Sequence, residues 1–352
     1  MKKYKFGICG AFDFEEKSTG GQSVKTREFY YALCDFINQD QILTLESTSY
    51  KRNPFTFFVR FLRLIKQCEN VIVFPAQKGI KVFAPLCAFW GNIYKTKIHY
   101  NVIGGWISNL IKSNNSLKKH LLKFDSILVE TSTMKNELEL LGFNNVYRIA
   151  NFKSLKAVNE IKSNSDPIKL CYFSRVAELK GIEDAIKVVK QLNSNITQCT
   201  LDIYGPIVED YKQRFNEISS SFNDSIKYRG VINPSDSVDT LKKYDLQLFP
   251  TRYSTEGIPG SILDGYFAGV PVVAARWNSF SDVVKDGVTG VGFEQCNLDS
   301  FYNCLLDLIN NQELILNMKE KCLKEAMLYD PRTVIQQFLN IVNGECFGDK
   351  SV

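Results

Sequence analysis

The chain has 352 residues, of which 45% are hydrophobic and 23% are charged, as is usual for a globular protein long enough to form two domains. No window approaches about 18 uninterrupted apolar residues, so we expect no membrane-spanning helix. Ten cysteines stand singly and only two histidines occur, which disfavours a zinc site and predicts reduced thiols in a cytosolic protein.

Charge is distributed unevenly along the chain. Residues 1–153 contain 22 Lys and Arg against 12 Asp and Glu, whereas residues 154–352 contain 21 against 26. A basic first half favours an anionic partner, namely a phospholipid surface, a lipid diphosphate or a nucleic acid. A solvated basic face without a partner is an equally good interpretation.

Short apolar runs alternate with helical patterns over the first 150 residues. Residues 4–12 are typical of a first strand, and a polar, glycine-rich loop separates them from a helical pattern. Further strand-like runs follow in the order QILTLES, NVIVFPA, IHYNVIG and SILVE. This alternation predicts βαβ units around a parallel sheet.

The loop STGGQSVKT contains Gly20 and Gly21 and opens the first helix. Adjacent glycines let backbone N–H groups approach an anion or a sugar closely, and a first βα turn is a suitable place for such a site. The spacing is neither G-x-G-x-x-G nor that of a Walker A loop. A loop that only needs positive φ angles is the alternative.

The segment NPFTFFVRFLRLIKQ, residues 53–67, mixes aromatic and aliphatic residues with Arg60, Arg63 and Lys66. This composition is typical of an amphipathic helix at a membrane interface. The same spacing fits a helix whose apolar face packs on a sheet. The first interpretation predicts peripheral attachment to an anionic inner leaflet.

A second α/β series begins after a polar stretch at residues 151–167, the best linker candidate in the chain. Its strand-like runs are IKLCYFS, CTLDIYG, IKYRG, LQLFPT and VPVVAA. Two parallel sheets in tandem predict a cleft between two sets of strand carboxyl ends, where such folds bind ligands.

Two carboxylates, Glu256 and Asp264, flank the start of a predicted helix. Pro259 suits the first helical position because it has no N–H to leave unsatisfied. The N–H groups that follow form the positive end of a helix dipole, which favours phosphates and sugar hydroxyls. Glu256 is then placed to face a ligand, and Asp264 to hold adjacent hydroxyls such as those of a ribose.

EGIPGSILDGYFAGVPVV resembles the E-x7-E region of family 4 retaining glycosyltransferases, whose architecture is GT-B. The resemblance extends over most of the chain, through TGGQSVKTREFYYAL, ILVETSTMKNELELLGFNNVYRIANF, FSRVAELKGIEDAIKVV and VVKDGVTGVGF. It implies an α/β fold of two Rossmann-like, doubly wound domains facing a central cleft. Residues 1–155, with a crossing helix at about 330–352, would bind the acceptor, and residues 166–329 the nucleotide-sugar donor.

The resemblance also implies roles for particular residues. Arg175 and Lys180 would offset the charge of a departing nucleoside diphosphate, and Glu256 would lie beside the donor sugar. The remaining donor-binding residues would be Gly20, Gly21, Gly257, Ile258, Pro259, Gly260, Ser261 and Asp264.

Two positions depart from the family pattern. The second acid is Asp264 where Glu is usual, which shortens its reach to the ribose by one methylene. Many members have a histidine near the reacting sugar, whereas His99 lies within a predicted strand here and is expected to be structural. Gly104 and Gly105 are expected to shape an acceptor pocket, with Trp106 as its wall.

The predicted enzyme is a hexosyltransferase that moves a sugar, with retention, from a nucleotide sugar to a glycan or lipid-linked saccharide. A UDP-sugar donor and an acceptor of a capsule, O-antigen or related surface polysaccharide are favoured. We expect no metal or other cofactor and no nucleic-acid partner. The protein is expected in the cytoplasm, with peripheral attachment to the inner face of the membrane.

Three rival functions deserve a test. A non-hydrolysing nucleotide-sugar 2-epimerase shares the architecture, but the shortage of histidines disfavours it. A non-catalytic scaffold that binds nucleotide sugars is the second rival, and the intact motifs disfavour it. An NAD-dependent dehydrogenase would need G-x-G-x-x-G, which is absent.

Overall fold

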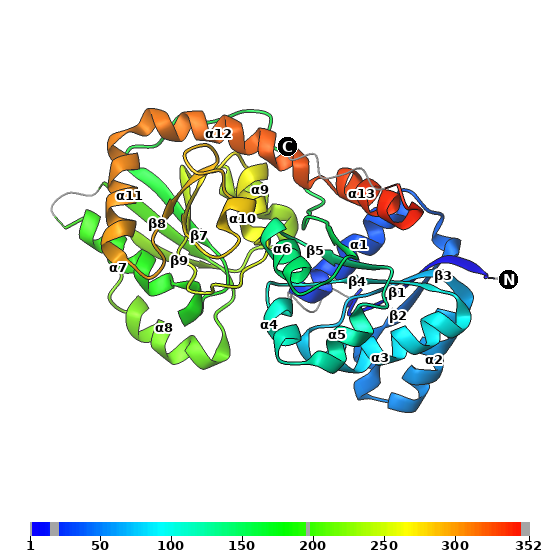
Figure 1. Cartoon of the computed structure of the whole chain (residues 1–352). Coiled ribbons are helices and arrows are strands. Elements are labelled where there is room, and N and C mark those ends of the chain that lie inside the picture. Colours follow the sequence, from blue (N-terminus) through cyan, green and yellow to red (C-terminus); the bar gives the residue numbers. More distant parts are fainter. Residues whose placement is uncertain (1, 15–20, 195–197, 346–352) are drawn as a thin grey trace. The chain divides into compact units, whose positions relative to one another are not determined.

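The chain folds into two α/β units, each built on a parallel six-stranded sheet (Figure 1). The computed structural model describes residues 2–14, 21–194 and 198–345. The first unit comprises Met1–Ser154 and Pro331–Val352, and the second comprises Leu155–Asp330. In the described residues, no helix is both long enough and apolar enough to cross a bilayer.

The sheet of the first unit has the order β2-β1-β3-β4-β5-β6, and all five pairings are parallel. Its strands are β1 Tyr4–Gly10, β2 Ile42–Glu46, β3 Cys68–Val73, β4 Lys97–Asn101, β5 Ser126–Val129 and β6 Val146–Arg148. The α-helices of this unit are α1 Gly21–Cys34, α2 Pro54–Gln67, α3 Gln77–Tyr94, α4 Ile107–Lys112, α5 Asn115–Leu121, α6 Ser132–Leu140 and α13 Pro331–Asn343. Short 3-10 helices lie at Gln39–Gln41 and Ser47–Lys51.

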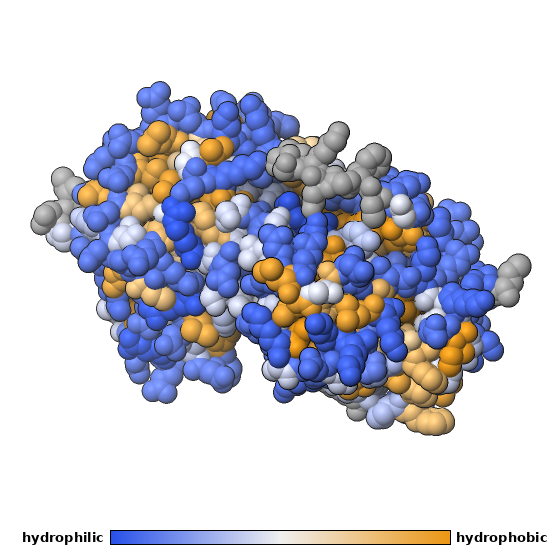
Figure 2. Space-filling model, in the orientation of Figure 1, coloured by the Kyte–Doolittle hydropathy of each residue, from blue (hydrophilic) through white to orange (hydrophobic). Residues whose placement is uncertain are grey.

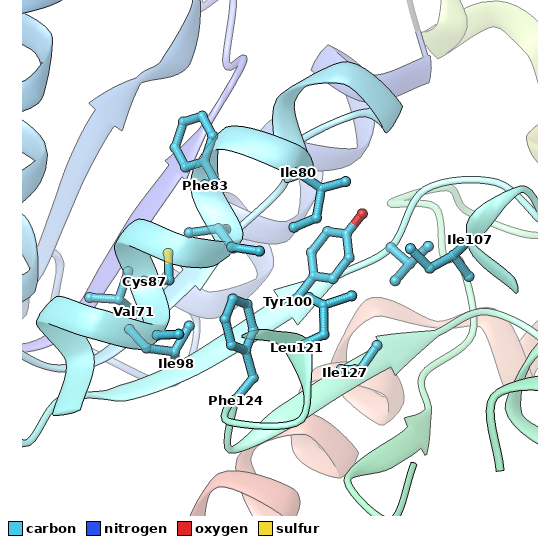
Figure 3. Close-up of a cluster of buried hydrophobic side chains, with 14 of the residues drawn as sticks. Val71, Ile80, Phe83, Cys87, Ile98, Tyr100, Ile107, Leu121, Phe124 and Ile127 are labelled. Atoms are coloured by element: carbon cyan, nitrogen blue, oxygen red, sulfur yellow. The ribbon is translucent and has the colours of Figure 1, made fainter. Parts of the chain in front are cut away.

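Helices cover both faces of this sheet, so most of its strand residues are buried. On one face, side chains of α3 and α5 meet those of β4 and β5, and the cluster includes the fully buried Tyr100 (Figure 3). On the other face, Phe29 of α1 and Phe338 of α13 pack edge to face, with ring centroids 5.1 Å apart. Figure 1 draws α13 beside α1, so the last helix completes the core of the first unit.

The sheet of the second unit has the order β12-β11-β10-β7-β8-β9 and is also parallel throughout. Its strands are β7 Ile168–Phe173, β8 Cys199–Tyr204, β9 Ile226–Gly230, β10 Leu246–Phe249, β11 Val272–Ala275 and β12 Gly290–Phe293. Its α-helices are α7 Ile182–Leu192, α8 Lys212–Ser219, α9 Ser237–Leu241, α10 Gly260–Phe267, α11 Leu298–Asn310 and α12 Gln312–Ala326. Its 3-10 helices are η3 Glu178–Lys180, η4 Glu209–Tyr211, η5 Pro234–Asp236, η6 Phe280–Asp282 and η7 Met327–Tyr329.

Gly181 lets two loops of the second unit approach each other. It ends η3 and precedes α7 with a φ of +70°, in the left-handed region. A Cβ at this position would lie 1.8 Å from the carbonyl oxygen of Pro250, which follows β10. The tight approach therefore requires a residue without a side chain.

A buried ion pair joins α12 to the start of β10. Lys319 and Asp245 are exposed by only 3% and 2%, with Nζ 2.9 Å from Oδ1. The carboxylate also accepts the N–H groups of Ser165 and Lys169, and Lys319 donates to the carbonyl of Lys162. The pair thus fastens residues 162–169, before and within β7, to the second unit.

We expect Gly181→Ala to destabilise the second unit more than Gly287→Ala. Gly287 has a similar φ of +73°, but no atom lies within 4 Å of its Cβ position. Gly287→Ala should therefore cost only the backbone strain, about 1–2 kcal/mol. Gly181→Ala should cost about 1–3 kcal/mol more because of the clash.

The loss of stability in each glycine variant is measured by urea denaturation. Both variants are made in a background in which the two tryptophans of the first unit, Trp90 and Trp106, are replaced by Phe. Trp277, which is buried in the second unit, then reports on that unit alone. Equal costs for the two glycine variants would contradict the close approach.

Lys319→Met should lower the free energy of unfolding of the second unit by about 3 kcal/mol, because it leaves the Asp245 charge buried without its cation. Adding Asp245→Asn removes that charge and should recover part of the loss. The same fluorescence measurement checks both variants. A double variant less stable than the single one would show that the carboxylate is not the source of the cost.

Candidate functional site

The strand order of the second unit reverses between β7 and β10. From β7 the chain continues to β8 and β9 on one side, and from β10 to β11 and β12 on the other. In doubly wound sheets this reversal leaves a crevice at the strand carboxyl ends, which is the usual ligand site. The segments after β7 and β10 contain the predicted residues Arg175, Lys180 and Glu256.

Lys180 and Glu256 form an ion pair at this position, although 76 residues separate them. Both side chains are largely buried, with 10% and 16% of their surface exposed. The Oε1 atom of Glu256 accepts both the Lys180 ammonium and the Thr251 hydroxyl, the latter at 3.0 Å. Among the described residues, Oε2 has no hydrogen-bond partner and remains able to accept one from a ligand.

Two aromatic rings flank the Lys180 ammonium. Its Nζ lies 5.5 Å from the ring centroid of Phe249 and 5.2 Å from that of Tyr253. The faces of such rings attract a cation. The ammonium is therefore held by a carboxylate and two rings before any ligand arrives.

Arg252 and Asp184 hold the segment after β10 against α7. The guanidinium donates two hydrogen bonds to the carboxylate, from Nε at 2.9 Å and Nη2 at 2.7 Å. The backbone N–H of Arg252 also donates to the carbonyl of Leu179 at 2.9 Å. These bonds, with the close approach at Gly181, position Lys180 and Glu256 relative to each other.

The N-terminus of α10 lies directly after Glu256 in the chain. The helix begins at Gly260, and Pro259, with ψ at 120°, is its N-cap rather than its first helical residue. The first helical hydrogen bond runs from the Ile262 N–H to the Pro259 carbonyl, so the N–H groups of Gly260 and Ser261 precede the bonded ladder. Gly257 and Ile258, which precede this turn, are buried.

Asp264 lies on the buried side of α10. Its side chain is 2% exposed, and Oδ1 accepts the Ser237 hydroxyl of α9 at 2.8 Å. The next residue, Gly265, packs on Gln247 of β10, whose Oε1 would be 2.3 Å from an added Cβ. The structure therefore ties Asp264 to α9, and its contact with a ribose stays a prediction.

Arg175 follows β7 and is exposed. Its carbonyl accepts the Tyr172 hydroxyl at 2.9 Å, which fixes the backbone, while no described residue bonds its guanidinium. The structure thus places Arg175 at the carboxyl edge without bringing it into the Lys180–Glu256 pair.

The predicted acceptor residues lie after β4 in the first unit. Gly104 has a φ of +83°, and the Trp106 indole N–H donates to the Ile103 carbonyl at 2.7 Å. Gly105 lies between them at the turn into α4. Gly21 begins α1 above the carboxyl ends of β1 and β3, whereas Gly20 lies outside the described residues.

The first unit contains a buried histidine and a buried ion pair. His99 is buried in β4 between Ser126 and Asn70, and burial lowers its pKa to about 3, with a smaller effect from the Lys97 charge. It is therefore neutral and structural, as the sequence suggested. Lys25 and Glu130 form a buried ion pair near the carboxyl ends of β4 and β5, which the sequence did not reveal.

Several contacts in the second unit were also missed from the sequence. Thr251, Tyr253 and the Arg252–Asp184 pair follow no pattern of spacing that local periodicity could show. The one indication of these residues in the sequence is their position, because all of them except Asp184 come just after a buried strand. In the described residues, no group of three or more His, Cys, Asp and Glu side chains is arranged to hold a metal ion.

Known proteins resemble this chain in sequence and in fold. Residues 154–325 match the family model described as Glycosyl transferases group 1. An uncharacterized glycosyltransferase of Methanocaldococcus jannaschii is 23% identical over 173 residues, which are 48% of this chain and 44% of that protein. The chain thus aligns with less than half the length of that relative.

Several solved structures match nearly the whole chain, and two of them are informative here. Anabaena HepE in complex with UDP has a TM-score of 0.75 at 14% identity, covering 98% of this chain and all of that one. The lipopolysaccharide outer core galactosyltransferase WaaB has a TM-score of 0.72 at 12% identity, covering 97% and 100%. The chain therefore has the GT-B fold, and its residues 154–325 match the glycosyl transferases group 1 family.

Proposed function

We propose that this protein is a retaining glycosyltransferase of family 4 that transfers a hexose from a nucleotide sugar to a saccharide acceptor. The observation that carries the proposal is the convergence of Lys180, Glu256 and the start of α10 at the reversal point of the second sheet. These groups offer a cation, a carboxylate and helix N–H donors to one ligand. A nucleoside diphosphate joined to a polyhydroxyl ring fits all three.

The second unit would bind the donor. Lys180 and the exposed Arg175 would neutralise the diphosphate, and the backbone of residues 257–261 would face its phosphates and the sugar. Glu256 would accept a sugar hydroxyl through Oε2, and Asp264 would hold the ribose. We favour UDP as the nucleotide, since the similar HepE structure is a complex with UDP.

The first unit would bind the acceptor. Gly104, Gly105 and Trp106 would line its pocket, while Gly20 and Gly21 would close over the donor phosphates. The match to WaaB, which acts on the lipopolysaccharide outer core, favours a glycan or lipid-linked saccharide of a surface polysaccharide. An acceptor of that kind would place the enzyme in the cytoplasm, at the inner face of the membrane.

The reaction we propose is a same-face displacement. The bond from the anomeric carbon to the diphosphate oxygen breaks, the acceptor oxygen bonds to the same face of that carbon, and its proton passes to the departing phosphate oxygen. Glu256 is bonded to Lys180 and Thr251, so it is suited to orient the sugar rather than to attack it. Lys180 would exchange part of its contact with Glu256 for the developing phosphate charge.

Lys180→Ala and Glu256→Gln should each lower the transfer rate by about 100-fold or more while the fold survives. The first removes the cation that offsets the leaving group, and the second removes the charge that holds this cation and orients the sugar. The rates are measured with a UDP-sugar and a lipid-linked acceptor, and products with and without acceptor are separated by chromatography.

Lys285→Ala is the matched control, because Lys285 also pairs with a glutamate, Glu325, but away from the strand carboxyl ends. It should leave the rate unchanged. Wild-type rates in both site variants would refute the site. Epimerised nucleotide sugar without acceptor would favour the epimerase, and donor binding without any turnover would favour a scaffold.

UDP should raise the melting temperature of the protein more than GDP or ADP does. A ligand that binds only the native state stabilises it in proportion to the logarithm of its concentration over Kd. The shift should shrink in Lys180→Ala, because the diphosphate loses a cation. A larger shift with GDP or ADP would overturn the assignment of the base while leaving the site in place.

A further inference from the structure

We propose that the outer surface of α2 and α3 in the first unit binds the anionic face of a lipid bilayer. We call this surface the α2–α3 face, defined by residues 52–66 and 78–97. Apolar side chains would enter the interface between headgroups and acyl chains, and the surrounding lysines and arginines would contact lipid phosphates. This inference goes beyond the transfer reaction and does not depend on it.

Helix α3 has an apolar stripe on its outer side as well as on its inner side. Ile80, Phe83 and Cys87 face the core, and the stick view shows Phe83 and Cys87 of this helix in the buried cluster (Figure 3). On the opposite side Val82 and Phe89 are 61% and 60% exposed. A surface helix of a globular protein is usually polar there, so this second stripe needs a partner.

The stripe continues over three turns of the helix. Val82, Leu86, Phe89 and Ile93 follow one another at intervals of four, three and four residues, which is the spacing of one helical face. Leu86 is half-buried and Ile93 is exposed. A continuous line of aliphatic and aromatic groups suits a lipid interface better than isolated apolar residues would.

Helix α2 adds further exposed apolar groups beside α3, on which it packs. Phe55 is 78% exposed, and Phe58 and Val59 are also exposed. Figure 2 shows apolar side chains gathered at the lower right, in the region where Figure 1 draws α2 and α3. The helix thus buries Phe61, Leu64 and Ile65 in the core, as its spacing predicted, and leaves other apolar side chains exposed.

The charge of the α2–α3 face is entirely positive. Residues 52–66 and 78–97 contain eight lysines and arginines and no aspartate or glutamate. Arg60, Arg63 and Lys66 are exposed on α2, and Lys78 and Lys81 on α3. The face therefore has a net charge of +8, against a net charge of +10 (22 − 12) for residues 1–153 as a whole.

Two cavities lie where α3 ends, and both are lined by Lys95 and Lys97. The first is also lined by Lys123 and Asp125, whose carboxylate already accepts the Ile98 N–H. The second adds Lys2 and Lys5, with Glu69 as the acid. Cationic hollows at the end of an apolar stripe provide places for lipid phosphates.

Charge also decides between a bilayer and other partners. In an isologous dimer through this face, the eight basic residues of one copy would meet the same eight of the other, and like charges repel. A nucleic acid would satisfy the charge but leave the Val82–Ile93 stripe exposed to water. Of these three partners, the anionic bilayer matches both the charge and the apolar surface.

Vesicle flotation of the full chain tests the proposal. The chain should float with vesicles of phosphatidylcholine and phosphatidylglycerol at low salt, and less at high salt or with phosphatidylcholine alone. Phe89→Ser/Ile93→Ser should lower the bound fraction about ten-fold through the lost apolar contact. Lys78→Gln/Lys81→Gln should lower the partition coefficient roughly five-fold for each charge removed.

Matched controls distinguish binding by the α2–α3 face from nonspecific binding to vesicles. Leu140→Ser removes an apolar side chain of α6 that is 88% exposed, and Lys321→Gln/Lys324→Gln removes two exposed charges of α12. Both controls should float like the wild type. Every variant should keep the melting temperature of the wild type and the increase in melting temperature that UDP causes. Loss of vesicle binding with an unchanged UDP response therefore reports on the α2–α3 face and not on the donor site.

Three outcomes would overturn the inference. One is the absence of flotation at low salt, or equal flotation of the wild type and both face variants. Another is a dimer by light scattering that Phe89→Ser/Ile93→Ser dissociates, which would assign the face to a second copy. The third is tighter retention on duplex DNA than on the vesicles at the same salt, abolished by Lys78→Gln/Lys81→Gln.

Discussion

The contact between Lys180 and Glu256 depends on one topological constraint, the reversal of strand order between β7 and β10. Two strands that lie next to each other in a parallel sheet end at the same edge, so the segments that follow them meet there. The helices to which these segments lead cover opposite faces, which leaves the edge open between them. A cation from one segment and a carboxylate from the other can then pair without either being enclosed in the core.

The supporting contacts convert this general arrangement into a defined geometry. Gly181 allows the chain after η3 to touch the carbonyl of Pro250, and Arg252 bonds both the Asp184 carboxylate and the Leu179 carbonyl. These contacts hold Lys180 beside Glu256 in the protein alone. A site whose charges are already in position needs little rearrangement when charge develops on a leaving group.

The two units use similar sheets for different chemistry. In the second unit, the functional edge combines Lys180, Glu256 and the start of α10. In the first, a buried Lys25–Glu130 pair lies at the corresponding edge, and exposed lysines and arginines occur on α2 and α3. In the described residues of the first unit, exposed positive charge and exposed apolar groups therefore occur together on the outer side of α2 and α3.

The sequence by itself determined the α/β class, the alternation of strands and helices, the polar stretch near the unit boundary and the helix that follows Glu256. These features depend on local periodicity and on Pro and Gly, which act within a few residues of the chain. It also singled out Glu256, from its place before a helix N-terminus, and Lys180, through a resemblance between motifs, but it did not indicate that they touch. The prediction that Pro259 is the first helical residue was wrong by one position, because its extended ψ makes it the N-cap.

Tertiary structure alone decided the strand orders, the Lys180–Glu256 and Arg252–Asp184 pairs, and the burial of Asp264 against Ser237. It also decided that α3 buries one apolar stripe and exposes another, a difference invisible in a sequence that is apolar on both sides. The physical reason is the range of the interactions. Periodicity reports which residues share a face of their own element, whereas the packing of elements distant in the chain decides which face meets the core, a partner charge or water.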